Sequence, residues 1–301
     1  MHRLGVSGAP AVALEQQSDG DVADEPNIFS GAANVDDSPP EKSVDADADE
    51  AGTAEIDGDT GEEIGDDTEE ADGEIDEEIA EDVFMARGSI RMNALMTITR
   101  NMAVVRNDGE LSLVDPLRLN EAGEKQIEAL GQVKHILRLG CFHGLDDPYY
   151  VERFKPEHWC QPGGTTYTEP AIDHELTAGG ELPFPDAELF CFEQTKQPES
   201  VLLLRRGDGL LLTCDAIQNY GDYRHNNLPA RLLMPFIGFP KTTLIGPLWL
   251  KGVTRDGGSL KSEFERLLDL PFDSLLSAHG SFLPSGAHAA VTAALNRAFP
   301  D

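Results

Sequence analysis

The first 84 residues of this 301-residue chain contain almost no positive charge and almost no aromatic side chains. Phe29 is the only aromatic residue before Phe84, and 28 aspartates and glutamates outnumber the two basic residues Arg3 and Lys42, which gives a net charge of −26. Such a segment repels itself and has too little apolar surface to offset the conformational entropy lost on folding. The composition therefore excludes a packed core here and predicts a disordered acidic tail over residues 1–86.

Long apolar runs and closely spaced cysteines are also absent. The longest uninterrupted apolar runs are far shorter than the roughly 20 residues of a membrane-spanning helix, so we expect no association with a membrane. The few cysteines lack the spacing of a zinc finger, and their low number in a large domain is typical of reduced thiols, which predicts a cytoplasmic protein. These cysteines are Cys141, Cys160, Cys191 and Cys214.

The second part of the chain, residues 87–301, has no excess of basic residues. From Met85 to the C-terminus, 27 acidic residues accompany 21 basic ones, so the strongly acidic character of the protein belongs to the tail. No basic stripe with interleaved aromatic residues is present, and we expect no nucleic-acid partner. The tail itself has the charge to attract a basic protein partner, an interaction that salt would screen. The second part is long enough to fold as one domain.

Three apolar runs in this domain stop abruptly at a histidine or an aspartate. Residues 135–139 lead into Cys-Phe-His-Gly-Leu-Asp-Asp at 141–147, residues 210–213 lead into Cys214 and Asp215, and residues 272–276 lead into Ser-Ala-His-Gly at 277–280. Short apolar runs of this kind predict buried strands, and polar residues just past strand ends are where α/β proteins gather their ligands. The pattern therefore predicts one polar site.

The remaining sequence alternates between strand and helix patterns. Asn107-Asp108-Gly109 predicts a hairpin turn, Asn120 predicts the start of a helix that ends at Gly131, and Asp147-Pro148 predicts an N-cap followed by the first helical residue. Further strands are expected at 89–97, 99–105, 111–114, 133–139, 187–193 and 201–205, and further helices at 228–234, 259–269 and 286–298. Strands with helices outside them indicate a layered sandwich.

This order of elements and polar strand ends, over about 215 residues, resembles the metallo-β-lactamase superfamily. The resemblance implies an α+β fold, in which two mixed sheets pack face to face with helices outside them as a four-layer αββα sandwich, preceded by the acidic tail. It also implies up to two zinc or iron ions at one edge of the sandwich. The family holds them with an H-x-H-x-D-H loop, a single histidine, a bridging aspartate and a final histidine.

Only part of this ligand set is carried over to the chain. His279, followed by a glycine after a strand, matches the final histidine, and Asp215 matches the bridging aspartate, with Cys214 where the family usually has glycine. Residues 195–202 resemble the family pattern G-H-T-P-G-S-x-x, but Lys196 replaces the metal-binding histidine.

The first histidine loop is altered in both possible registers. In one register His143 takes the place of the second histidine and Cys141 that of the first, and Leu145 and Asp146 then stand on the Asp-His pair. In the other, Asp146 and Asp147 stand on that pair and both histidines are lost. The resemblance therefore implies that one metal position has lost its ligands and the other at least one.

The candidate metal ligands are His143, Asp215, His279 and one of Asp146 or Asp147. This set could hold one divalent ion, zinc, iron or manganese, and such an ion lowers the pKa of bound water so that hydroxide can attack a carbonyl group.

The two altered ligand positions, Cys141 and Lys196, allow the opposite outcome, a site without metal. The Lys196 ammonium would oppose a neighbouring metal and could instead form an ion pair with Asp215. Asp147 could serve only as a helix cap, and His143 could be a buried, hydrogen-bonded residue left from an ancestral site. We expect Tyr220, Tyr223 and Trp249 to pack in the core rather than line a pocket.

The sequence therefore leaves two functions open. One is a metal-dependent hydrolase that acts on a small-molecule ester, lactone, thioester or amide. The other is a catalytically inactive pseudoenzyme that uses the same scaffold as a binding module.

Overall fold

The structure is a computed structural model and describes residues 72–300. Along its central strands, successive apolar side chains face opposite sides, because a strand has a period of two. In β9 (Ser200–Leu204), Leu202 and Leu204 contact a core between two sheets, whereas Val201 and Leu203 contact a second core beneath helices. Strands that are apolar on both faces must be covered on both faces, and this requirement produces the layers of the fold.

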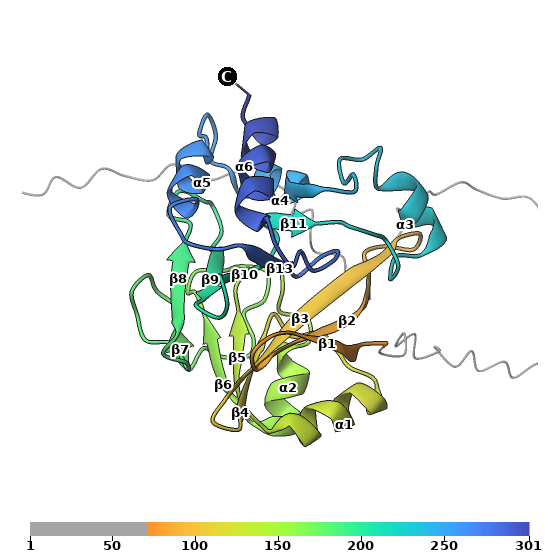
Figure 1. Cartoon of the computed structure of the whole chain (residues 1–301), viewed down its shortest axis with the longest axis vertical. Helices are drawn as coiled ribbons and strands as arrows, with labels where there is room; N and C mark the ends of the chain where they lie inside the picture. Colours follow the sequence, from red (N-terminus) through yellow and green to blue (C-terminus); the bar gives the residue numbers. More distant parts are fainter. Residues whose placement is uncertain (1–71, 301) are drawn as a thin grey trace, which may run out of the picture.

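Two sheets form the inner layers (Figure 1). The larger sheet has its strands in chain order: β1 (Glu74–Ala80), β2 (Val83–Arg91), β3 (Thr97–Asn107), β4 (Glu110–Val114), β5 (Gln132–Arg138), β6 (Glu157–Cys160) and β7 (His174–Glu175). The smaller sheet has the order β13 (Ser274–Ser277), β10 (Leu210–Thr213), β9 and β8 (Ala187–Cys191). A separate pair joins β11 (Ile217–Asn219) and β12 (Thr243–Ile245).

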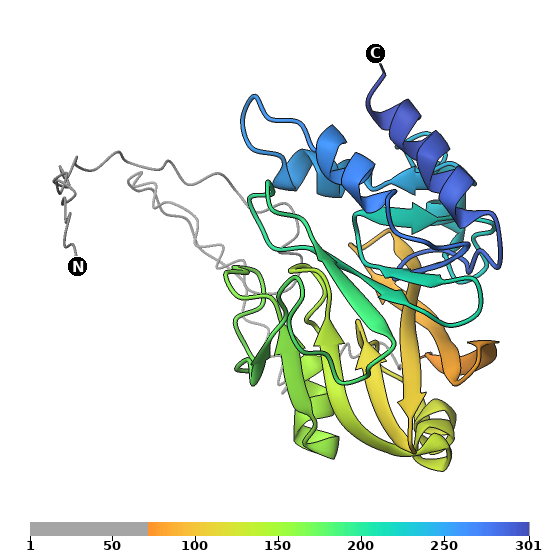
Figure 2. The same ribbon diagram turned by 60° about the vertical axis from the view of Figure 1, so that its left-hand side comes forward.

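Helices cover both outer faces (Figures 1 and 2). The larger sheet carries α1 (Glu121–Leu130) and α2 (Asp147–Phe154), and their Ile127 and Tyr150 complete the core on that side. The smaller sheet carries α4 (Pro247–Val253), α5 (Lys261–Leu267) and α6 (Ala287–Ala298), and a short α3 (Leu228–Leu233) lies apart from them. The four-layer αββα sandwich predicted from the sequence is confirmed.

Local sequence signals explain where several elements begin and end. Asp108 and Gly109 have positive φ angles of 51° and 82°, as the tight turn of a hairpin with right-handed strand twist requires. The Asn120 side chain accepts a hydrogen bond of 2.8 Å from the backbone N–H of Gly123 and so caps α1. The predicted cap of α2 is shifted by one residue, because Asp146 occupies the N-cap position and Asp147 is the first helical residue.

The predicted boundary of the acidic tail is wrong for residues 72–86. The first 71 residues of that tail lie outside the described residues, but β1 and the start of β2 fall within its last part. Ile75 packs against the core under α1 and Ile79 packs against the core between the sheets. The pairing of β1 shifts by one residue between Ile75 and Glu77, which places Ile79 on the opposite face of the strand. The exposed acidic residues between these isoleucines dominate the composition and hide the strand.

Three strand ends meet at one edge of the sandwich. Because β10 and β13 are parallel neighbours with Thr213 opposite Ser277, the residues that follow them leave the sheet side by side. The backbone N–H of Asn101 in β3 donates a hydrogen bond of 2.8 Å to the carbonyl of Ala278, which ties this edge to the larger sheet. The loop after β5 reaches the same edge, where Gly140 pairs with Glu199. No described helix is both long enough and apolar enough to span a bilayer.

We expect a chain that begins at residue 87 to be markedly less stable than one that begins at residue 72. The shorter chain lacks β1 and the fully buried Val83 and Met85, and each fully buried apolar side chain contributes about 1.5–3 kcal/mol. Urea denaturation followed by circular dichroism should show a loss of several kcal/mol in the free energy of unfolding. Equal midpoints for the two chains would contradict the place of β1 in the fold.

Candidate metal site

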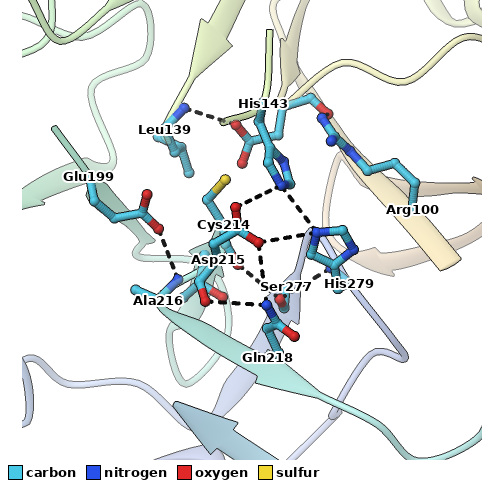
Figure 3. Close-up of polar contacts among 12 residues, drawn as sticks. Arg100, Leu139, His143, Glu199, Cys214, Asp215, Ala216, Gln218, Ser277 and His279 are labelled. Carbon is cyan, nitrogen blue, oxygen red and sulfur yellow. Dashed lines mark hydrogen bonds and ion pairs between the residues drawn. The ribbon is translucent and has the colours of Figure 1, made fainter. Parts of the chain in front are cut away.

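His143, Asp215 and His279 converge where the three strands end (Figure 3). The Nε2 atom of His143 lies 3.2 Å from Asp215 Oδ2, and the Nε2 atom of His279 lies 3.2 Å from Asp215 Oδ1. The two Nε2 atoms are 3.1 Å apart, and all three side chains are buried. The structure therefore brings together three of the ligands predicted from the sequence, in a group whose geometry could hold a metal ion.

The backbone of β3 fixes the proton on His279. Its Nδ1 atom lies 2.9 Å from the carbonyl oxygen of Thr99, and because a carbonyl only accepts, Nδ1 must carry the hydrogen. The lone pair of the neutral ring is then on Nε2, which faces Asp215. Ser277 supports the same turn, since its hydroxyl accepts a hydrogen bond from the His279 N–H at 3.2 Å and donates one to the Cys214 carbonyl.

The protonation of the other two groups also suits a metal ligand. Burial, together with the nearby Arg100 guanidinium, lowers the pKa of His143 to about 3, so its ring is neutral at pH 7. Burial alone would raise the pKa of Asp215, but the contact with His143 holds the pKa of this carboxyl well below its usual range. The neutral His143 ring and the Asp215 carboxylate are forms that bind metals.

The donor atoms fit a single ion in both chemistry and spacing. With a proton fixed on Nδ1 of His279, its Nε2 and the Asp215 oxygen are both acceptors at 3.2 Å, a repulsive contact that a cation between them removes. Zinc binds nitrogen and oxygen at about 2.0–2.2 Å in tetrahedral sites, which places neighbouring ligand atoms about 3.3 Å apart. The observed separations of 3.1–3.2 Å are close to this value.

Asp146 and Asp147 do not join this group. Asp146 accepts a hydrogen bond of 3.0 Å from the backbone N–H of Arg118, and Asp147 is fully buried between Arg138 at 3.5 Å and His158 at 3.4 Å. Because α2 starts at Asp147, the chain has already turned to the outer side of the larger sheet. The prediction that one of these aspartates completes the ligand set is not supported.

Neither of the two altered ligand positions belongs to the group formed by the three donors. Lys196 is about half exposed and pairs with Asp256 at 3.0 Å, so the predicted ion pair with Asp215 is wrong. The backbone explains this, because the Lys196 N–H donates to the Val253 carbonyl at 2.7 Å and turns the segment toward α4. Cys141 is buried, and burial raises the pKa of its thiol far above the usual range.

Asp115 is a neighbour of the site that the sequence analysis missed. It follows β4 directly, with its φ at 50°, and its Oδ1 atom accepts a hydrogen bond of 2.9 Å from the Leu139 N–H. Burial raises the pKa of Asp115 to about 6. Asp115, His143 and Cys214 form a second close group of donor atoms that shares His143. The signal was present, since Leu-Ser-Leu-Val-Asp is a fourth apolar run that ends at an aspartate.

Glu199 is a second missed neighbour, a fully buried carboxyl where the family pattern has glycine. Its Oε1 atom accepts a hydrogen bond of 2.9 Å from the Ala216 N–H, next to Asp215. Gly140 leaves the space for it, because a Cβ atom there would lie 2.6 Å from Glu199 Oε2. Burial and the nearby Asp215 charge raise the pKa of Glu199 well above its usual range.

Two cavities adjoin the donor atoms. The first has a volume of about 140 Å³ and we call it the methionine cavity; its walls include Met92, Met96, Met234, Tyr220, Phe239 and Trp249. The second has a volume of about 100 Å³ and includes Arg100, Tyr167 and His143 in its wall. Asp215 and His279 line both. Tyr220, Tyr223 and Trp249 are buried as expected, but Tyr220 and Trp249 also line a cavity, which the sequence analysis did not expect.

Comparison with known proteins identifies the fold. No protein-family model and no curated protein sequence matches the chain. Many solved metallo-β-lactamase structures match it in fold. The chain therefore has the metallo-β-lactamase fold, with three side chains that could hold a metal ion at the edge of its sandwich.

Three of these solved structures show the extent of the likeness. The DIM-1 metallo-β-lactamase is 10% identical over 76% of this chain and 99% of its own, with a TM-score of 0.55. The TMB-1 structure is 10% identical over 75% of this chain and 98% of its own, with a TM-score of 0.54. A metallo-β-lactamase from Hirschia baltica is 10% identical over 74% and 98%, with a TM-score of 0.51. At such identities the likeness concerns the fold.

We expect two substitutions of Glu199 to separate the effect of its charge on the free energy of unfolding from the effect of its hydrogen bond. Since the native state keeps the Glu199 proton to a higher pH than the unfolded state does, the protein loses stability as pH rises above about 4.5. Glu199→Gln removes this loss and keeps an acceptor for the Ala216 N–H, so its advantage in free energy of unfolding should grow from pH 5 to pH 8.

Glu199→Ala provides the contrast to the glutamine variant. It leaves the buried Ala216 N–H unpaired, which costs about 1–3 kcal/mol, and adds a cavity that costs more. Urea denaturation across this pH range measures both variants. A difference between Glu199→Gln and the unsubstituted protein that stays constant with pH would show that Glu199 is already ionised.

Proposed function

We propose that this protein is a metal-dependent hydrolase with one divalent ion, zinc, held by His143, Asp215 and His279. The observation that carries the proposal is the contact between acceptor atoms. Two imidazole nitrogens and a carboxylate lie within 3.2 Å of one another, although the Thr99 carbonyl already holds the His279 proton on the far side of the ring. Three protein ligands with an open position are typical of catalytic zinc sites.

The described residues support a single ion over two. The other donors expected from the family pattern point elsewhere, since Asp147 contacts Arg138 and His158 and Lys196 contacts Asp256. The second donor group, which contains Asp115 and Cys214, uses the same His143. Iron and manganese accept a similar ligand set, and metal analysis distinguishes them from zinc.

A bound zinc ion would polarise a carbonyl group and lower the pKa of a water molecule, which suits hydrolysis of a small ester, lactone, thioester or amide. Neighbouring residues of the protein orient the ligand side chains. Thr99 and Ser277 hold the His279 ring and its backbone, and Gln218 donates to the Asp215 carboxylate at 3.3 Å. The proposal places the protein in the cytoplasm, consistent with four cysteines that are all free and buried.

We expect the purified protein to bind one zinc ion per chain. His143→Ala and His279→Ala should each weaken zinc binding by more than about 100-fold, because even the loss of a residue that only orients a ligand costs 10–100-fold. Titration against a competing chelator gives the affinity, and elemental analysis gives the metal and its stoichiometry.

His158→Ala is the matched control for these substitutions. His158 is as buried as the ligands and also lies beside an aspartate, Asp147, but it is outside the donor group. The His158→Ala variant should bind zinc with the affinity of the unsubstituted protein. A protein that binds no divalent metal, with the two ligand variants unchanged in every respect, would favour the inactive binding module.

We also expect Lys196→His to leave the stoichiometry at one ion, although it restores the histidine of the family pattern. The side chain at this position points toward Asp256 and solvent, and the backbone bond to Val253 keeps it there. Elemental analysis of this variant after zinc loading tests the point directly. A second tightly bound ion would show that the segment turns inward and that the site is built for two metals.

A further inference from the structure

The methionine cavity lies directly beside the proposed zinc ligands and has apolar walls. Asp215 and His279 form one side of it, and three thioethers and three aromatic rings form most of the rest. Two polar side chains in the wall already have partners, because the Tyr220 hydroxyl donates to Gln218 at 3.0 Å and Gln218 in turn donates to Asp215. An apolar ligand would therefore leave no buried polar group of Gln218 or Tyr220 without a bond.

Size and composition limit what can bind in the cavity. Its volume of about 140 Å³ is close to that of an apolar cavity of roughly 150 Å³ that binds benzene, which corresponds to about six carbon atoms. Methionine side chains are flexible and polarisable and adapt to ligands of variable shape. Met92, Met96 and Met234 come from two separate segments of the chain, so the wall can adjust from both sides.

The rim of the cavity is also apolar. Ile237 and Leu248 line it and are nearly half exposed to solvent, and Met92 is 38% exposed. Exposed apolar residues that are contiguous with a cavity are typical of ligand-binding grooves. The second cavity, which shares Met92, Asp215 and His279 with the first, has Arg100 and Tyr167 in its wall and suits a more polar group. The reacting bond would then lie between an apolar and a polar part of the substrate.

We propose that the substrate carries an apolar acyl group of about six carbons, which binds in the methionine cavity. The assignment to an acyl group rests on the proposed hydrolase function, because the carbonyl must reach the ion held by Asp215 and His279. Binding of the apolar group itself does not depend on the metal. Each added methylene should raise affinity about fourfold, until the chain fills the cavity.

Methionine NMR of the metal-free protein tests the binding step. With methyl-labelled methionine and a series of primary alcohols from ethanol to octanol, the signals of Met92, Met96 and Met234 should shift. The signals of Met85 and Met102, which are buried in other cores, should not. Affinity should rise up to about hexanol and then level off. Absence of shifts at the three cavity methionines, or equal shifts at Met85 and Met102, would overturn the proposal.

Two substitutions fill the cavity from different elements. Met96→Trp, in the turn between β2 and β3, and Leu248→Trp, in α4, should each weaken hexanol binding at least tenfold. Leu95→Trp is the matched control, because Leu95 precedes Met96 in the same turn but is 67% exposed and does not line the cavity. Equal weakening by Leu95→Trp, or no weakening by either filling variant, would also overturn the proposal.

Hydrolysis by the zinc-loaded protein separates this proposal from the proposed function. For p-nitrophenyl esters from acetate to octanoate, kcat/KM should follow the same dependence on chain length as alcohol binding. Alcohol binding without any hydrolysis would count against the hydrolase and leave the apolar site in place. Hydrolysis with no dependence on chain length would count against the acyl group and leave the hydrolase in place.

Discussion

The contact between the two sheets is the constraint on which the rest of the structure depends. Leucines of β9 and β10 pack against Val105, Val114 and Leu137 of the larger sheet, and burial of this apolar surface is the main force that holds the layers together. The contact fixes how the strand ends align. Because β10 and β13 are parallel and β5 ends at the same edge, three otherwise distant segments must present their polar residues to one another.

Bringing these polar residues together at a buried position is energetically unfavourable. Two imidazoles and a carboxylate face one another in a buried position, where unpaired polar groups are expensive. The surrounding contacts hold this arrangement in place, with Thr99 on the His279 ring and Ser277 on its backbone. Glu199 and Asp115 lie around it, and burial raises the pKa of both carboxyl groups above their usual range.

Sequence reasoning succeeded where the signal was local. The turn at Asp108-Gly109 and the cap at Asn120 depend on neighbouring backbone atoms, and His279 stands at a strand end with a glycine after it. Sequence reasoning failed where the average composition of a segment concealed a strand, or where contacts with distant residues set the orientation of a side chain. The acidic composition hid β1, whose two isoleucines are buried by partners far along the chain, and the orientation of Lys196 depends on Val253.

The sequence by itself determined many of the strands and helices, a layered sandwich and the presence of His143, Asp215 and His279 at strand ends, because periodicity and turn residues act over a few positions. The four-layer αββα order came from the resemblance to the metallo-β-lactamase superfamily. Only the tertiary structure decided which polar side chains meet. Asp146 and Asp147 are close to His143 in the chain, yet the start of α2 turns them away. Asp115 and Glu199 are distant in the chain, yet the packing of two sheets brings them to the site. Proximity in space depends on the path of the backbone, which neighbouring residues alone do not fix.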